Sequence, residues 1–204
     1  MNTKRIIYAP LALVAALGMP LTALAASSDW AGPYVGINGG YAQDKNVTIG
    51  TSNSFDVTGG FGGVQAGYNW AAGSVVVGLQ ADANAADIKG DGTCGVGVSC
   101  STKMDQLYKI QGRVGLPLNN FLLYLSAGGA SGQIEAKRGA FSDSTYQTGW
   151  LAGLGGAMAF NSHWNGNIEI QYIDFGNNKY TLNGNSVGVD SKFTTVGIGI
   201  NYKF

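Results

Sequence analysis

The chain contains few charged residues, cysteines, prolines and histidines. Its charge content and its hydrophobic content exclude two classes of protein. Only 12% of its 204 residues are charged, against a usual value of about 25%. Because 12 Lys and Arg balance 12 Asp and Glu with no basic block, a nucleic-acid-binding protein is excluded. Hydrophobic residues make up 45%, which excludes a disordered chain. Glycine is abundant instead, with 33 residues where an average composition gives roughly 14.

Residues 1–25 have the features of a secretory signal peptide. Lys4 and Arg5 precede an apolar run that contains two prolines, and Ala23-Leu24-Ala25 forms a small-x-small cleavage site. The prolines and the cleavage site favour removal over a transmembrane anchor. We therefore expect cleavage after Ala25 and one exported domain over residues 26–204.

Long hydrophobic runs are missing after residue 25, where no stretch approaches the roughly 18 to 20 apolar residues of a membrane helix. Eight segments instead alternate between two kinds of side chain, as strands do. The clearest, over residues 75–85, puts Val77 and Leu79 on one face and Gln80 and Asp82 on the other. The other segments cover residues 35–42, 63–70, 108–116, 121–128, 150–160, 164–172 and 195–204.

The apolar faces of these eight segments contain no Asp, Glu, Lys or Arg. A sheet face in water would carry charge, and a chain this short cannot cover every strand with a second protein layer, so lipid is the simplest partner. Backbone groups in hydrocarbon must all be paired, which requires a sheet that closes on itself. Segments of about 10 residues therefore predict an all-β protein, an eight-stranded antiparallel up-and-down transmembrane β-barrel in the outer membrane.

The links between the segments predict the orientation of the barrel. Short links at residues 71–73, 117–120 and 161–163 are expected to face the periplasm, and longer polar loops to face outward. The predicted outer loops cover residues 44–60, 86–103, 133–147 and 176–191. Aromatic residues near the periplasmic strand ends predict an interfacial girdle of Tyr34, Trp70, Phe121, Phe160, Trp164, Tyr202 and Phe204. A second group lies nearer the outer ends: Tyr41, Phe61, Tyr108, Trp150 and Tyr172.

Several short stretches resemble the small porin-family outer-membrane β-barrel proteins of alphaproteobacteria, which include opacity-type and heme-binding members and are distantly similar to the membrane domain of outer-membrane protein A. The stretches are DWAGPYVG at residues 29–36, GYNW at 67–70, GW at 149–150, YIDFG at 172–176 and VGIGINYKF at 196–204. The resemblance implies a fold and a location more than an activity. It also implies that the C-terminal pattern of Ile198, Ile200, Tyr202 and Phe204 is the signal read by the barrel-assembly machinery.

The polar faces of the strands are expected to point into the barrel. Asp82 and Lys109 each lie seven residues from the periplasmic end of their segments, so we expect them to face each other, with Arg113 and Glu169 lower down. Opposite charges at similar depth would pair and fill a narrow interior, whereas a pore needs one sign of charge along an open path. The predicted lumen polar network is Gln65, Gln80, Asp82, Asn84, Lys109, Gln111, Arg113, Glu169 and Gln171.

Cys94 and Cys100 lie six residues apart in a predicted outer loop of an exported protein, which favours a disulfide. A metal or redox pair would need more ligands than the neighbouring sequence offers. The single histidine, His163, falls in a predicted periplasmic turn with no acid nearby, so we predict neither an enzyme nor a cofactor.

The outer loops offer the best place for a specific activity. Phe141, Tyr146 and Tyr180 are candidates for contact with a host molecule, lipopolysaccharide or heme. Basic residues near the outer rim are candidates for lipopolysaccharide phosphates: Lys45, Lys89, Lys103, Lys137, Arg138 and Lys179. The sequence thus predicts a structural barrel that supports the envelope and displays surface loops, in contact with outer-membrane lipid, lipopolysaccharide and the assembly machinery. A small porin for passive solute uptake, and loop-mediated adhesion or heme binding, are the alternatives.

Overall fold

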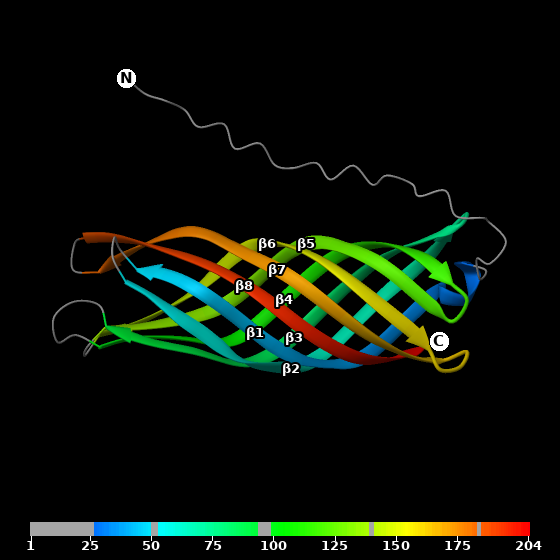
Figure 1. The fold of residues 1–204 in the computed structure, drawn as a ribbon, viewed down its shortest axis with the longest axis horizontal. Coiled ribbons are helices and arrows are strands. Elements are labelled where there is room, and N and C mark those ends of the chain that lie inside the picture. Colours follow the sequence, from blue (N-terminus) through cyan, green and yellow to red (C-terminus); the bar gives the residue numbers. More distant parts are fainter. Residues whose placement is uncertain (1–26, 50–52, 94–98, 139–140, 183–184) are drawn as a thin grey trace, which may run out of the picture.

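The structure is a computed structural model that describes residues 27–49, 53–93, 99–138, 141–182 and 185–204 (Figure 1). The predicted signal peptide and its cleavage site after Ala25 lie outside these residues. A short 3-10 helix, η2 (Ser27–Trp30), precedes eight strands. They are β1 (Gly32–Ile49), β2 (Asn53–Ala72), β3 (Val75–Thr93), β4 (Ser99–Leu118), β5 (Phe121–Arg138), β6 (Phe141–Ala159), β7 (Trp164–Leu182) and β8 (Asn185–Lys203). Among the described residues no helix is long and apolar enough to cross a membrane.

The eight strands form a closed antiparallel barrel, which confirms the predicted fold. Each strand pairs with its neighbours in sequence, and β8 pairs with β1, for example at Ile200 and Ile37. Helix η2 and the C-terminal end of β8 lie at the same end of the barrel (Figure 1). We call this the periplasmic end, because the short turns between strands also lie there.

The alternation of side chains along each strand separates an outward face from an inward face. In β3, Leu79 is 51% exposed whereas Gln80 is 2% exposed. Ile110 in β4 and Ile198 in β8 are likewise exposed, and their neighbours Gln111 and Gly199 are buried. The uncharged faces predicted from the sequence therefore point away from the barrel axis.

The strands are much longer than the predicted 10 residues, with lengths of 18 to 20 residues. Most of the residues expected in outer loops belong to these strands, so β1 continues to Ile49 and β2 begins at Asn53. The ladder registers shift between Ala85 and Ile88 in β3, and similar shifts interrupt β1, β4 and β7. A bulge changes which face each later side chain occupies, so a strict two-residue period ends there although pairing continues.

The three predicted periplasmic links are confirmed as tight connections. Gly73 (φ 63°) and Asn119 (φ 54°) adopt the left-handed backbone conformation that glycine and asparagine tolerate best. In the link between β6 and β7, the Asn161 Oδ1 atom accepts hydrogen bonds from the backbone N–H groups of His163 and Trp164, at 2.9 Å each. These turns bring the aromatic ends of the strands to one level of the barrel.

Most of the predicted girdle residues are exposed on the outward face, but two assignments are wrong. Tyr34 and Phe61 point inward and are 3% and 8% exposed. Both residues fall on the inward face by simple alternation. Tyr34 is next to the outward-facing Val35, and Phe61 lies an even number of residues, four, before the inward-facing Gln65. Aromatic character placed them in the girdle, whereas alternation alone places them inside.

Candidate functional site

The interior of the barrel consists of three layers of side chains. Polar residues from β1 to β5, β7 and β8 fill the middle, which we call the polar layer. Toward the outer end lies an outer apolar layer of Ala42, Val57, Ile88, Met104, Leu107, Ala130, Ile134, Leu151, Ile173, Phe175 and Phe193. Toward the periplasm lies a periplasmic apolar layer of Trp30, Val76, Leu122, Tyr124 and Ala157. The structure places all nine residues of the predicted lumen network in the polar layer, each of them buried.

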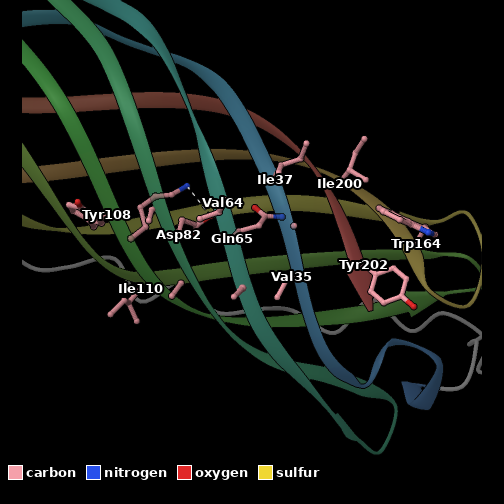
Figure 2. Close-up of a pocket in the computed structure, with 15 residues that line it drawn as sticks. Val35, Ile37, Val64, Gln65, Asp82, Tyr108, Ile110, Trp164, Ile200 and Tyr202 are labelled. Atoms are coloured by element: carbon pink, nitrogen blue, oxygen red, sulfur yellow. Dashed lines mark ion pairs between the residues drawn. The ribbon is translucent and has the colours of Figure 1, made fainter. Parts of the chain in front are cut away.

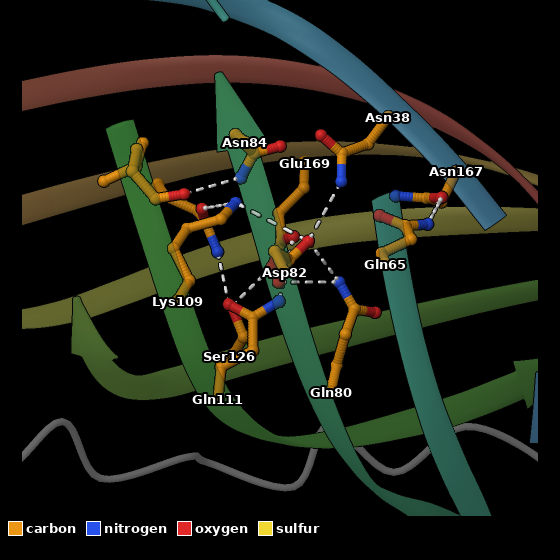
Figure 3. Close-up of polar contacts among 12 residues, drawn as sticks. Asn38, Gln65, Gln80, Asp82, Asn84, Lys109, Gln111, Ser126, Asn167 and Glu169 are labelled. Atoms are coloured by element: carbon orange, nitrogen blue, oxygen red, sulfur yellow. Dashed lines mark hydrogen bonds and ion pairs between the residues drawn. The ribbon is translucent and has the colours of Figure 1, made fainter. Parts of the chain in front are cut away.

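Asp82 and Lys109 lie together in the polar layer, as neighbours across the β3–β4 ladder (Figure 3). The Lys109 Nζ atom is 4.0 Å from Asp82 Oδ1 and donates a hydrogen bond to Gln171 Oε1 at 2.9 Å. Asp82 also accepts hydrogen bonds from the side-chain amides of Gln80, at 3.1 Å, and Asn38, at 3.3 Å. The carboxylate is thus held by one cation and two amides.

Glu169 is held by neutral donors. Its Oε1 atom accepts a hydrogen bond from the Ser126 hydroxyl at 2.6 Å, and its Oε2 atom accepts one from Gln111 Nε2 at 3.3 Å. Gln171 in turn donates to the Gln111 side-chain oxygen. These contacts join β4, β5 and β7 across the interior, so the network ties strands that are not neighbours in the sheet.

Arg113 contacts amides and aromatic rings. Its guanidinium donates to Asn69 Oδ1 at 3.1 and 3.2 Å and to Gln80 Oε1 at 3.0 Å. The guanidinium carbon also lies 4.8 Å from the ring centre of Tyr34 and 5.2 Å from that of Tyr124, within the range of a cation–π contact. The structure therefore does not bring Arg113 and Glu169 together as an ion pair.

The remaining predicted members complete the network. Gln65 donates to the side-chain oxygens of Asn167 and Asn201, and Asn84 donates to the Leu107 carbonyl at 3.1 Å. The predicted network left out several participants, namely Tyr34, Asn38, Asn69, Tyr124, Ser126, Asn167 and Asn201. Alternation alone puts all of them on the inward face, and only Tyr34 had been assigned elsewhere, to the girdle.

The outer apolar layer was also missed. It begins only two residues beyond the polar layer. On β4, Leu107 is the next inward side chain above Lys109 toward the outer end of the barrel, and on β7, Ile173 is the next one above Gln171. The rings of Phe175 and Phe193 meet edge to face with centres 6.0 Å apart. This layer separates the buried charges from the outer mouth of the barrel.

The periplasmic mouth is closed by the segment that precedes β1. The Trp30 side chain packs with Val76, Leu122 and Tyr124, and its backbone carbonyl accepts a hydrogen bond from Asn69 Nδ2 at 3.1 Å. Lys203 donates to the Asp29 carbonyl. Between the two apolar layers, the cavity that touches Asp82, Lys109 and Glu169 has a volume of about 20 Å³, room for about one water molecule.

The other predicted site residues lie elsewhere. Cys94 is outside the described residues, so its pairing with Cys100 of β4 stays a prediction. The side chains of Lys45, Lys137, Arg138, Phe141, Lys179 and Tyr180 are likewise not described. Lys89 and Lys103 each form an ion pair with an aspartate two residues away on the outward surface, Lys89 at 2.8 Å from Asp87 and Lys103 at 2.5 Å from Asp105.

The C-terminal pattern lies on the strand that closes the barrel. Ile198, Ile200 and Phe204 are exposed on the outward face and Tyr202 is half-buried. The edge of the Tyr202 ring contacts the rings of Trp164 and Phe204, and the His163 ring stacks on Tyr202. Recognition of this strand by the assembly machinery stays a prediction.

Comparison with known proteins gives relatives over nearly the whole chain. Residues 9–204 match the family described as outer membrane protein beta-barrel domain. The chain is 34% identical to a 31 kDa outer-membrane immunogenic protein of Brucella melitensis biotype 1, covering 91% of this chain and 88% of that protein. It is 31% identical to a 22 kDa outer membrane protein of Rhizobium leguminosarum bv. viciae, covering 86% and 80%.

Solved structures show the same fold at low identity. The outer membrane protein OprG from Pseudomonas aeruginosa is similar with a TM-score of 0.55 and 18% identity, covering 85% of this chain and 96% of that chain. Neisserial surface protein A has a TM-score of 0.51 and 14% identity, covering 84% and 97%.

Proposed function

Since the chain belongs to the outer membrane protein beta-barrel domain family, we propose that it is a sealed barrel that supports the integrity of the outer membrane and displays surface hairpins. The protein is an outer-membrane protein, as its relatives are. A signal peptide of residues 1–25, removed on export, belongs to the same proposal. The alternative that the proposal rejects is a small porin.

The observation that carries the proposal is the position of the buried charges between two apolar layers. A conducting path needs a continuous row of polar groups or water from one mouth to the other. Here the polar layer ends at Leu107 and Ile173 on one side and at Trp30 on the other. An eight-stranded barrel is just wide enough for its own side chains, so packed apolar side chains leave ions no route.

The charges of the polar layer further support a packing role. Asp82, Glu169, Lys109 and Arg113 are all buried, and two charges of each sign leave no net field to attract one kind of ion. Their partners come from several strands, so the network favours one register of the closed sheet over shifted ones. We assign it the role of holding the wall of the barrel in one arrangement.

The length of the strands supports the display of surface structure. Strands of 18 to 20 residues exceed the 9 to 11 residues that cross a bilayer, so their outer parts stand above the membrane. The ion pairs of Lys89 and Lys103 lie on this part.

Because both lysines are already paired, they are weaker candidates for lipopolysaccharide phosphates than the sequence alone predicted. The Brucella relatives are named as immunogenic, and protruding hairpins are the part of this chain that a host would meet.

Planar-bilayer recording of the refolded mature protein tests the proposal. We expect no steady single-channel conductance over a range of voltages, from protein whose folding is verified by its faster migration on a gel when unboiled. Steady conductance of the folded protein would support the porin instead. In cells, deletion of the gene is expected to increase sensitivity to detergent, and the wild-type gene should restore resistance.

A further inference from the structure

A groove crosses the outward wall of the barrel (Figure 2). It has a volume of about 980 Å³ and lies between two rows of side chains that run from strand to strand along the ladder registers. The first row is Tyr108, Ala83, Val64, Ile37 and Ile200, and the second is Ile110, Ala81, Ala66, Val35, Tyr202 and Trp164.

Small side chains in the middle of both rows create the groove. Ala66 and Ala81 face each other across the β2–β3 ladder, and Ala83 follows on the same face. Larger side chains rise on both sides, with Tyr108 and Ile110 on β4 and valines and isoleucines on β1 and β8. An outward surface built from leucine and isoleucine would have no such depression at this place.

The chemistry of the groove matches hydrocarbon. Every side chain that points outward from it is uncharged. Asp82 and Lys109 contribute to its floor, but their side chains point into the barrel, where they are buried. A charged headgroup or an acidic or basic peptide would find no partner along the groove, whereas an acyl chain needs none.

The two ends of the groove coincide with the two aromatic girdles. Tyr108 lies at the outer end, and its hydroxyl donates a hydrogen bond to Gln106 Oε1 at 3.1 Å. Trp164 and Tyr202 stand at the periplasmic end, beside the exposed ring of His163. Indole and phenol groups at this level are suited to lipid headgroups on the periplasmic side of the membrane.

We propose that this groove binds one phospholipid of the periplasmic leaflet, with an acyl chain lying over Ala66 and Ala81 and the headgroup beside Trp164 and Tyr202. A second copy of the chain fits the groove less well. A two-fold dimer would place the groove of one barrel against the same groove of the other, which leaves both hollows empty. The inference goes beyond a sealed interior and holds whether or not the barrel conducts.

Native mass spectrometry after reconstitution tests the assignment. The mature protein is refolded into vesicles of phosphatidylethanolamine and phosphatidylglycerol, extracted into a mild non-ionic detergent, and its retained lipids are counted. The test variant is Ala66→Leu with Ala81→Leu, which fills the groove. The matched control is Ala127→Leu with Ala152→Leu, an outward-facing alanine pair across the β5–β6 ladder that is not part of the groove.

We expect the wild type and the control to retain one phospholipid per chain, and the test variant to retain about tenfold less, because two leucine side chains occupy the place of several methylene groups. Equal retention by the test variant and the control, or no retention by the wild type, would overturn the proposal. A two-chain species lost only in the test variant would assign the groove to a dimer instead. In a second arm with lipopolysaccharide in the vesicles, preferential retention of lipopolysaccharide would overturn the phospholipid assignment. The gel shift of unboiled samples verifies that all three proteins fold.

Discussion

The polar layer and the outer apolar layer lie inside the same barrel on the same strands, yet they hold it together in different ways. Lys109 and Gln171 are joined by a hydrogen bond across the interior, while Leu107 and Ile173, two residues further out on the same strands, belong to an apolar cluster. The polar layer fixes which residues contact each other, because each hydrogen-bond donor needs an acceptor at a particular place. The apolar layer excludes water and needs only complementary volumes.

This difference explains how the proposed sealed barrel can bury four charged residues. Buried charges are costly unless they are paired and hydrogen-bonded, and the polar layer supplies those partners. The apolar layers lie between these charges and the two mouths of the barrel. The charges then contribute specificity of assembly, whereas the apolar side chains contribute the seal.

The largest expected effect comes from removing one charge of the polar layer. Lys109→Met leaves the Asp82 carboxylate buried without its cation, which is expected to destabilise the barrel by about 3–5 kcal/mol. The measurement is urea unfolding of protein reconstituted in lipid vesicles. Adding Asp82→Asn to this variant should recover part of the loss, since the unpaired charge disappears. A Lys109→Met protein as stable as the wild type would show that the polar layer is hydrated.

A smaller effect is expected from a truncation in the outer apolar layer. Ile173→Ala leaves a cavity in a packed layer and should cost about 2–4 kcal/mol. The control is Ile170→Ala on the same strand, where the side chain is exposed on the outward face and acyl chains can fill the space. Equal losses of unfolding free energy in the two variants would contradict the assignment of an inward seal and a lipid-facing wall.

A still smaller loss of stability, about 1–2 kcal/mol, is expected from Trp30→Ala, since the residue belongs to a short 3-10 helix outside the sheet. The more informative measurement is conductance. Because each apolar layer closes one side, Trp30→Ala alone should remain silent in planar bilayers. Combining it with Phe175→Ala and Phe193→Ala, which open the outer layer, should produce conductance. Current through Trp30→Ala alone would mean that the outer layer does not seal.

The smallest effect is expected at the exposed Asp87–Lys89 pair, above the outer girdle. Lys89 donates a hydrogen bond to Asp87 at 3.0 Å, which lowers the pKa of that carboxyl. Any stabilisation from the pair is present above the ordinary pKa range of aspartate and is lost as the pH falls through the lowered value. Lys89→Met should leave the unfolding free energy at neutral pH unchanged, while an NMR titration should show the pKa of Asp87 rising toward its ordinary range. A clear loss of stability at neutral pH would contradict the solvent-exposed placement of the pair.

Alternation in the sequence was sufficient to predict the membrane-crossing part of the fold. It placed Leu79 outward and Gln80 inward, because the face that a side chain occupies depends on its own strand alone. The same rule would have placed Tyr34 inside, but its aromatic character was given more weight. The extended strands were not predicted, because bulges change the phase of the pattern beyond Ala85 and Met104. The outer apolar layer was not predicted because the inward face was expected to be polar, although Leu107 and Ile173 keep the inward alternation of Lys109 and Gln171.

The sequence by itself determined that one side of each of the eight alternating segments is uncharged, and hence that the sheet is expected to close within lipid, because this pattern is local to each segment. Only the tertiary structure decided which inward side chains meet. Lys109 reaches Gln171, 62 residues away, and Arg113 lies between the rings of Tyr34 and Tyr124. These contacts, and the groove formed by alanines of neighbouring strands, depend on the register and closure of the barrel, which bring distant residues within reach of one another.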